Sequence, residues 1–208
     1  MVNCLTMSRA GSGLAQKAQR RVPVARPPAP RAEDLVALAR RRFLRGERFG
    51  VEELAAELAV SRATAYRWAG NADQLAGLVI ASLAEDTFRR ALREARGRGA
   101  ARVVDAVARG MRYVATSEAY RAFVARDPQR TLRIVASKDG PVQQRTIALH
   151  EELLLDEVRR GTLTLPVDAH TMAYALVRIV ESFLYADAIA GETPDLDKAV
   201  TIIKLLLR

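Results

Sequence analysis

The stretch VEELAAELAVSRATAYRWAGNADQL (Val51–Leu75) predicts two short helices separated by a tight turn and followed by the start of a longer helix. Leu54, Ala55 and Leu58 recur at helical spacing and give the first helix a compact apolar face. Ser61 is a good N-cap for the second helix, because its hydroxyl can accept a hydrogen bond from a free amide of the first turn. We therefore expect a turn just before Ser61.

The second of these short helices is polar on one side. Arg62, Thr64 and Arg67 are expected to point outward, whereas Ala65 and Trp68 can turn inward. A short helix, a turn and a short polar helix form the layout of a helix-turn-helix, whose second helix enters the major groove of DNA. The stretch therefore predicts a unit that binds double-stranded DNA.

Length and composition favour an all-α protein. The 208 residues suffice for one large or two small domains. Apolar residues make up 50% of the chain and aromatic residues only 5%, and neither the aromatic nor the β-branched residues are grouped into alternating strands. No apolar run approaches the ~18 residues of a membrane span. The first thirty residues lack the ~7–15-residue apolar core of a signal peptide. The single cysteine, Cys4, excludes an internal disulfide framework, so we expect a cytoplasmic protein without membrane contact.

The net charge of +9 is concentrated in the N-terminal third of the chain. Residues 1–74 hold 13 Lys/Arg and 7 Asp/Glu, whereas residues 75–208 hold 20 and 17. Positive charge beside a groove-reading helix is the electrostatic pattern expected for a nucleic-acid partner. The alternative explanation is an arginine-rich composition typical of a high-GC genome.

Residues 1–30 carry five basic residues, no acidic residue and four prolines. A segment of this composition cannot bury enough apolar surface to order itself, so we expect a disordered basic arm. The arm could lie along DNA phosphates or in a minor groove. The alternative is a solvated tail without a role.

Helical periodicity continues through the rest of the chain, and no strand pattern occurs in it. Turn and cap residues divide the apolar pattern into helices. Besides the two short helices, the expected elements are Ala32–Arg45, Ala72–Arg96, Ala100–Thr116, a short helix capped by Ser117, Gln129–Ser137 opened by the N-cap and N1 pair Asp127-Pro128, a helix opened by Gly140-Pro141 and reaching Arg160, a helix capped by Asp168 and reaching about Ala190, and Leu196–Leu207.

The stretch from Phe49 to Leu75 resembles the DNA-binding domain of the TetR family of transcriptional regulators. The residues that match the family's order and spacing are Val51, Leu54, Ala55, Leu58, Val60, Ser61, Thr64, Tyr66, Trp68 and Leu75. The resemblance implies that Tyr66 contacts a phosphate and that Arg62, Ala63, Thr64 and Arg67 face bases or backbone. The complete expected DNA-binding set is Arg48, Ser61, Arg62, Ala63, Thr64, Tyr66, Arg67 and Asn71.

Three alanines depart from the family pattern. Ala59 replaces the usual turn glycine, which costs roughly 1 kcal/mol if its φ is positive. Ala69 replaces an aromatic residue under the recognition helix, and Ala72 replaces a lysine that contacts phosphate. Helix N-terminal amides behind Asn71 could still hold that phosphate. We expect somewhat weaker DNA binding, unless the basic arm compensates.

The helix that follows Asp168 is apolar nearly all round, so it must be covered on both sides. Pairing it with the Gln143–Arg160 helix would give a four-helix bundle across a two-fold axis. A homodimer suits a palindromic operator. The expected interface residues are Ile147, Leu154, Val158, Val177, Leu184 and Tyr185. A monomer with a large internal core is the alternative.

Arg178 and Glu181 interrupt this apolar helix at i, i+3 spacing. They could form an ion pair. Arg178 could instead present donors to an oxygen-rich ligand in an apolar cavity. The expected effector-pocket residues are Met111, Tyr113, Tyr120, Phe123, Tyr174, Arg178, Glu181 and Phe183, although aromatic residues on helices are more often simply core.

The segment RIVESFLYADAIAGETPDLDKA (Arg178–Ala199) resembles the ligand domain of QsdR-type regulators within the TetR family. The resemblance implies a small lactone or related acyl compound as the effector. It also implies a helix-turn-helix DNA-binding domain at residues 31–71 and a helical effector-binding and dimerisation domain at residues 72–208, which follow the arm at residues 1–30.

We find no catalytic constellation in the sequence, and we expect neither a metal site nor a cofactor. The two histidines, His150 and His170, fall on different expected helices, and no paired-cysteine or HExxH spacing occurs. We therefore expect a dimeric repressor that a small-molecule effector releases from its operator. The alternatives are an architectural DNA-binding protein and, less favoured, a helical enzyme.

Overall fold

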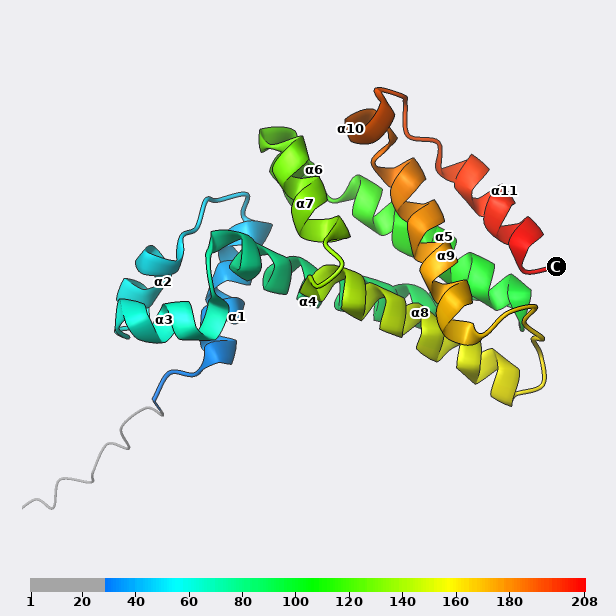
Figure 1. Cartoon of the computed structure of the whole chain (residues 1–208), viewed down its shortest axis with the longest axis horizontal. Coiled ribbons are helices and arrows are strands. Elements are labelled where there is room, and N and C mark those ends of the chain that lie inside the picture. The colour runs from blue at the N-terminus through cyan, green and yellow to red at the C-terminus, as the bar shows by residue number, and fades with distance from the viewer. Residues whose placement is uncertain (1–28) are drawn as a thin grey trace, which may run out of the picture.

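The computed structural model describes residues 29–208, and every regular element in this range is an α-helix (Figure 1). This confirms the predicted all-α fold class. The predicted basic arm lies outside the described residues, except for its last two. The helices are α1 (Ala32–Leu44), α2 (Val51–Glu57), α3 (Arg62–Ala69), α4 (Ala72–Glu94), α5 (Ala100–Thr116), α6 (Glu118–Arg126), α7 (Pro128–Ala136), α8 (Pro141–Arg159), α9 (Ala169–Leu184), α10 (Ala186–Ala190) and α11 (Leu196–Leu206).

The expected caps account for most of the helix boundaries. Side chains of Ser61, Ser117, Asp127 and Asp168 accept hydrogen bonds from backbone amides in the first turns of α3, α6, α7 and α9. Proline occupies the first turn of α7 and of α8, where its missing N–H costs nothing. The helices that the sequence predicted start within about one residue of the expected position, whereas α10 was not predicted as a separate helix.

One predicted helix is divided in the structure. The expectation of a single helix from Asp168 to about Ala190 was wrong, because the chain leaves helical geometry at Tyr185, with φ −112° and ψ 24°. The Tyr185 ring is buried there, and its hydroxyl lies in hydrogen-bonding contact with that of Tyr120. The short helix α10 starts after this break and leads into the turn before α11 (Figure 1).

Helices α1 and α3 pack against α4 at one end of the molecule, and α2 packs against α1 and α3 (Figure 1). Their shared core is built on fully buried residues such as Leu35, Leu54, Ala65 and Leu75. The same apolar cluster continues into α7 and α8, through residues such as Val135. The three-helix head is therefore joined to the rest of the protein by continuous packing.

A second apolar cluster fills the other end of the molecule. Helix α8 packs between α4 and α9, and α11 covers α5 and α9. The core of this region includes Val103, Leu154, Met172, Leu176 and Ile203, all of which are almost completely buried. Within residues 29–208, none of the helices combines the length and apolar character needed to cross a membrane.

Candidate nucleic-acid interface and central cavity

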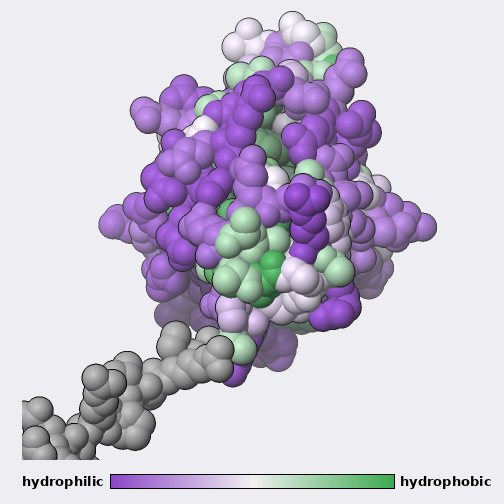
Figure 2. All heavy atoms as spheres, turned by 90° about the vertical axis from the view of Figure 1, so that its left-hand side faces the viewer, coloured by the Kyte–Doolittle hydropathy of each residue, from purple (hydrophilic) through white to green (hydrophobic). Residues whose placement is uncertain are grey.

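Helix α3 presents a polar face to solvent because its opposite face is fixed in the head. Ala65 and Ala69 are buried and Trp68 is half-buried against the head's core. Arg62, Ala63, Tyr66 and Arg67 are exposed, and the large Tyr66 side chain retains 45% of its accessible surface. Seen from the end that carries the head, the protein surface is predominantly hydrophilic (Figure 2). A fixed helix with an exposed basic and hydroxyl-bearing face matches the geometry of a groove-reading element.

The N-termini of α3 and α4 are held by hydrogen-bonded side-chain caps. Ser61 Oγ accepts from the Thr64 amide over 3.1 Å, and the two hydroxyls lie 2.8 Å apart. After α3, Asn71 Oδ1 accepts from the amides of Asp73 and Gln74, each over 2.9 Å. The Asn71 side chain is thus occupied in capping α4, and the two amides that the sequence reasoning offered to a phosphate already have a partner.

The turn between α2 and α3 contains backbone strain. Ala59 has φ 53° and is the one non-glycine residue with positive φ among the described residues. The φ of Ala59 is therefore positive, which is the case in which alanine was expected to be less favourable than glycine at this turn. Left-handed geometry costs an L-residue roughly 1–2 kcal/mol, and this cost is carried by the turn that sets the angle between α2 and α3.

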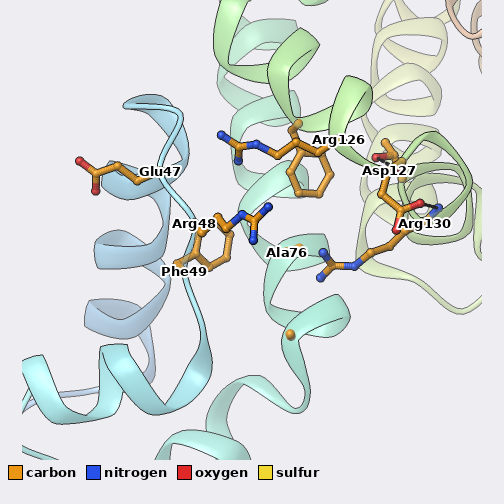
Figure 3. Close-up of a pocket in the computed structure, with 10 residues that line it drawn as sticks. Glu47, Arg48, Phe49, Ala76, Arg126, Asp127 and Arg130 are labelled. Carbon is orange, nitrogen blue, oxygen red and sulfur yellow. Dashed lines mark hydrogen bonds between the residues drawn. The ribbon is translucent and has the colours of Figure 1, made fainter.

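A polar pocket of about 320 Å³ lies where the head meets α6 and α7 (Figure 3). Arg48, Arg126 and Arg130 extend toward this space from the α1–α2 connection, α6 and α7 (Figure 3). Arg126 donates a hydrogen bond to the Gly46 carbonyl, and Arg130 Nε pairs with Asp73 Oδ1 at 2.6 Å. These contacts link α6 and α7 to the head and to the first turn of α4.

A second cavity, of about 360 Å³, lies in the centre of the protein between α4, α5, α6, α8 and α9. Most of its wall is apolar, formed by residues such as Ile80, Leu83, Val114, Val142 and Val180. Phe43 and Leu44 at the end of α1 also border it, so this cavity touches the head directly. A mostly apolar cavity with a few polar groups is the usual form of a small-molecule site.

Uncharged polar groups stand on the inner wall of this cavity. The hydroxyls of Tyr120 and Tyr185 are hydrogen-bonded to each other, and burial raises the pKa of Tyr120 to about 12. His150 lies with Nδ1 2.8 Å from the Thr146 carbonyl oxygen, to which a neutral ring with a protonated Nδ1 donates. Burial lowers the pKa of His150 to about 4, so the imidazole is uncharged at neutral pH.

Glu181 is the acidic residue of the cavity wall, and its side chain is only 12% exposed. Burial raises its pKa, although Arg178 and Gln143 favour the ionised form. Gln143 Nε2 donates to Oε1 over 2.5 Å. Arg178 Nη1 lies 2.8 Å from Oε2 as an ion pair, but its N–H is not directed at that oxygen as a hydrogen bond. The sequence left two roles open for Arg178, an ion pair with Glu181 or hydrogen-bond donation to a ligand, and the structure contains the ion pair.

Comparison with known proteins places this geometry in a family. Residues 98–208 match the family described as "Tetracyclin repressor-like, C-terminal domain". The structure also aligns with that of the transcriptional repressor QsdR from R. erythropolis, of the TetR family, with 33% sequence identity and a TM-score of 0.80. The alignment covers 85% of this chain and 93% of that one. The chain belongs to the TetR family.

This TetR-family membership confirms the predicted resemblance and the regulator class, and the chain is a transcriptional regulator rather than an enzyme. A structure of the fatty acid degradation regulator FadR from Bacillus halodurans aligns with 14% identity and a TM-score of 0.49, over 85% of this chain and 97% of that one. No curated protein sequence gives a significant match.

The predicted effector-pocket residues are only partly brought together in this TetR-family structure. Tyr120 and Glu181 line the central cavity, and Tyr113 lies at its edge beneath Arg90, whose guanidinium is 4.3 Å from the ring centroid. The other predicted wall residues lie elsewhere. Met111 is in the second apolar cluster and Phe183 packs against it, whereas Phe123 lines the polar pocket between the head, α6 and α7. Tyr174 is exposed, and Arg178 does not line the central cavity.

Sequence reasoning missed Val142, Thr146 and His150, which line the cavity from one face of α8. Their i, i+4, i+8 spacing was the available signal, because residues four apart stack on one side of a helix. Helical aromatic residues were favoured instead. The predicted aromatic residues Phe123 and Phe183, and the predicted Met111, pack in the apolar clusters because their helices turn those positions away from the cavity.

Three of the six predicted dimer-interface residues are buried within their own chain, and the other three are not. Leu154, Val177 and Tyr185 are at most 8% exposed within a single chain, since they pack against its own helices. Offering them to a second subunit was therefore an error. Ile147 and Leu184 are half-buried and Val158 is exposed, so these three remain candidates for a contact between subunits.

Proposed function

We propose that this TetR-family regulator is a repressor that binds a palindromic operator as a dimer and is released by a small, largely apolar effector, such as a lactone or acyl compound. It would act on DNA in the cytoplasm. The observation that carries the proposal is the central cavity, whose walls include both α4, which follows the recognition helix, and the end of α1. One site thus touches the DNA-reading head through α1 and also touches α4, the helix that leads from the head into the rest of the protein.

Helix α3 and its flanks would supply the DNA contacts. Arg62, Ala63, Tyr66 and Arg67 are exposed on one fixed helix, and Arg48 is exposed in the connection between α1 and α2. Arg62 meets Glu52 only at 3.5 Å, and both side chains are at least half exposed, so a phosphate or base can replace that weak pair. Ser61 and Thr64 would act through the cap that fixes the start of α3, and Asn71 through the cap that fixes the start of α4.

Exposed apolar residues on α8 and α9 support a dimer. Leu155 and Val158 on α8 and Tyr174 on α9 each leave more than a third of their surface exposed. Neighbouring exposed apolar residues on packed helices are typical of surfaces that a second subunit covers. Pairing through these helices would hold two recognition helices at a fixed separation, which must be roughly 34–36 Å to reach successive major grooves.

Release would follow from the coupling between the cavity and the head. An effector that fills the cavity would favour a different position of α4, and the contacts of Arg126 with Gly46 and of Arg130 with Asp73 would transmit this shift to the head. A tenfold loss of operator affinity requires the effector to bind the DNA-free conformation more tightly by only about 1.4 kcal/mol. The repressor role is supported by the 33% identity with QsdR, a transcriptional repressor.

Replacing one recognition-helix arginine tests the DNA-binding assignment. Arg67→Ala removes an exposed guanidinium from α3 and should weaken binding to the DNA upstream of the protein's own gene about 10- to 100-fold, as expected for a base-reading arginine. Dimerisation, measured by light scattering, should be unchanged. Fluorescence anisotropy on the labelled fragment provides the affinity.

Arg93→Ala is the matched control, because it removes the same charge from an exposed position on α4 remote from α3. The control variant should keep at least half of the wild-type affinity. If Arg67→Ala binds the fragment as tightly as Arg93→Ala does, the assignment of α3 as the recognition helix is wrong.

A further inference from the structure

We infer that the effector is an uncharged molecule with a hydrogen-bonding head group, and that Glu181 excludes carboxylates from the central cavity. This inference rests on the proposed function of that cavity as the effector site. It goes further by stating which charge the effector has and which residue selects it.

The charges around the cavity are distributed unevenly. Arg90 stands at the edge, where it is exposed, and it is paired with Glu94 at 3.0 Å and placed over the ring of Tyr113. The ring of His150 is buried and uncharged. Among the described residues of the wall, Glu181 is therefore the one interior side chain that can carry a charge, and that charge is negative.

The cation nearest to Glu181 does not line the cavity. Arg178 reaches Glu181 from the outside, keeps its guanidinium partly in solvent at 43% side-chain exposure, and is paired with Oε2. The amide of Gln143 is buried and donates to Oε1. A carboxylate entering this region would therefore find another carboxylate and no free cation, in surroundings where like charges repel strongly.

The same wall suits an uncharged polar group. Tyr120 and Tyr185 share one hydrogen bond between their hydroxyls, which leaves one hydroxyl proton free to donate to a ligand carbonyl. Glu181 lines the cavity, and its carboxylate accepts one directed hydrogen bond, from Gln143, so it retains capacity to accept another from an N–H or O–H of the ligand. An amide or a hydroxylated ester or lactone with an apolar chain satisfies both groups and fills the apolar part of the cavity.

This selectivity has a consequence for what the regulator detects. Hydrolysis of an ester, lactone or amide produces a carboxylate from an uncharged compound. A cavity that rejects the carboxylate responds to the intact compound and loses its ligand as soon as that compound is hydrolysed. The reaction class that removes the signal is therefore acyl hydrolysis.

The test uses matched probes that differ only in the head group. Primary amides of the straight-chain acids with six to twelve carbons are compared with the corresponding carboxylates at pH 7.5, by thermal shift and by calorimetric titration of the full chain. The amide that binds best should do so about a hundredfold more tightly than its carboxylate, because like charges placed together without solvent cost several kcal/mol. Equal or tighter binding of the carboxylates, or no binding in either series, overturns the inference.

Substitution of the acid identifies its role. Glu181→Gln keeps the shape of the side chain and removes its charge, so it should reduce the preference for amide over carboxylate to less than about tenfold. Glu192→Gln, which makes the same change at an exposed residue after α10, should leave the preference unchanged. A preference that survives in Glu181→Gln shows that another group selects the ligand.

A second variant keeps the test informative if Glu181→Gln folds poorly. Tyr120→Phe removes one hydroxyl of the tyrosine pair and should weaken amide binding about fivefold, as expected for loss of one hydrogen bond, while the carboxylates stay excluded. Because these titrations contain no DNA, their outcome is independent of operator binding. A chain that selects amides but fails to bind its upstream DNA would refute the proposed function and leave the ligand preference established.

Discussion

Glu157 is buried and Glu181 is half-buried in the C-terminal part of the protein, and their surroundings differ sharply. Glu157, near the end of α8, is 1% exposed and accepts hydrogen bonds from the Gly99 amide over 2.6 Å, from the Thr162 hydroxyl over 2.7 Å and from Arg102. Burial acts to raise the pKa of Glu157, but these three donors outweigh it and the pKa is lowered. Glu181 has one directed donor, and burial leaves its pKa raised.

The difference shows how buried charge can serve structure or function in one fold. The Glu157 site is closely built: a Cβ added to Gly99 would lie only 2.1 Å from the Thr162 carbonyl oxygen, so the glycine backbone can approach Glu157 where another residue would clash. The Glu181 site borders an open cavity and leaves an oxygen without a directed donor. Complete hydrogen bonding indicates a structural role, whereas incomplete hydrogen bonding beside a cavity indicates a place for a ligand.

The largest effect is expected at Glu157. Glu157→Ala leaves the Gly99 amide and the Arg102 guanidinium without their main partner and should lower the free energy of unfolding by about 3 kcal/mol. The value lies at the low end for a broken buried pair, because Arg102 keeps Asp156 at 3.4 Å and is 18% exposed. Urea denaturation monitored by circular dichroism measures this loss in the free energy of unfolding. A loss as small as that of Glu192→Ala, an exposed control, would mean that the network adds no stability.

The contribution of Glu157 should disappear in acid. Because its pKa is lower in the folded state than the ordinary 4.5, the unfolded state binds the proton more readily and protonation favours unfolding. The stabilisation is therefore complete above pH 4.5 and is lost as the pH falls through the folded-state pKa. The difference in unfolding free energy between wild type and Glu157→Ala should shrink below pH 4.5. A difference that stays constant down to pH 3 would contradict this mechanism.

The sequence was a good guide wherever structure depends on neighbours along the chain. Ser61, Asp127-Pro128 and Asp168 each carry their cap or N1 signal within a few residues, and the helices begin where these residues indicate. The two faces of α3 could be predicted for the same reason, since its exposed and buried positions alternate within eight residues. The strain at Ala59 was also visible, because the position required a conformation that alanine adopts at a cost.

The cavity could not be predicted in the same way because it is assembled from residues far apart in the chain. Thr146 and Glu181 come from different helices, and Tyr120 comes from a third. Which face of each helix turns inward depends on how all of them pack. The apolar pattern of α9 could not show whether Val177 meets its own core or a second subunit, and in the structure it is buried in its own chain.

The smallest effect, and the opposite sign, is expected for Glu181→Gln. The folded-state pKa of Glu181 lies above 4.5, so the folded protein binds this proton more tightly than the unfolded chain does. Wild type therefore loses stability as the pH rises from 4.5 through that raised pKa, and the glutamine variant does not. The variant gives up the ion pair with Arg178, which is worth at most about 1 kcal/mol because Arg178 is 43% exposed.

Thermal unfolding between pH 4 and 8 tests this prediction. The stability of the Glu181→Gln variant relative to wild type should increase as the pH rises. If the variant instead becomes progressively less stable than wild type as the pH rises, Glu181 is a structural carboxylate like Glu157, and its place in the cavity wall no longer indicates a ligand contact.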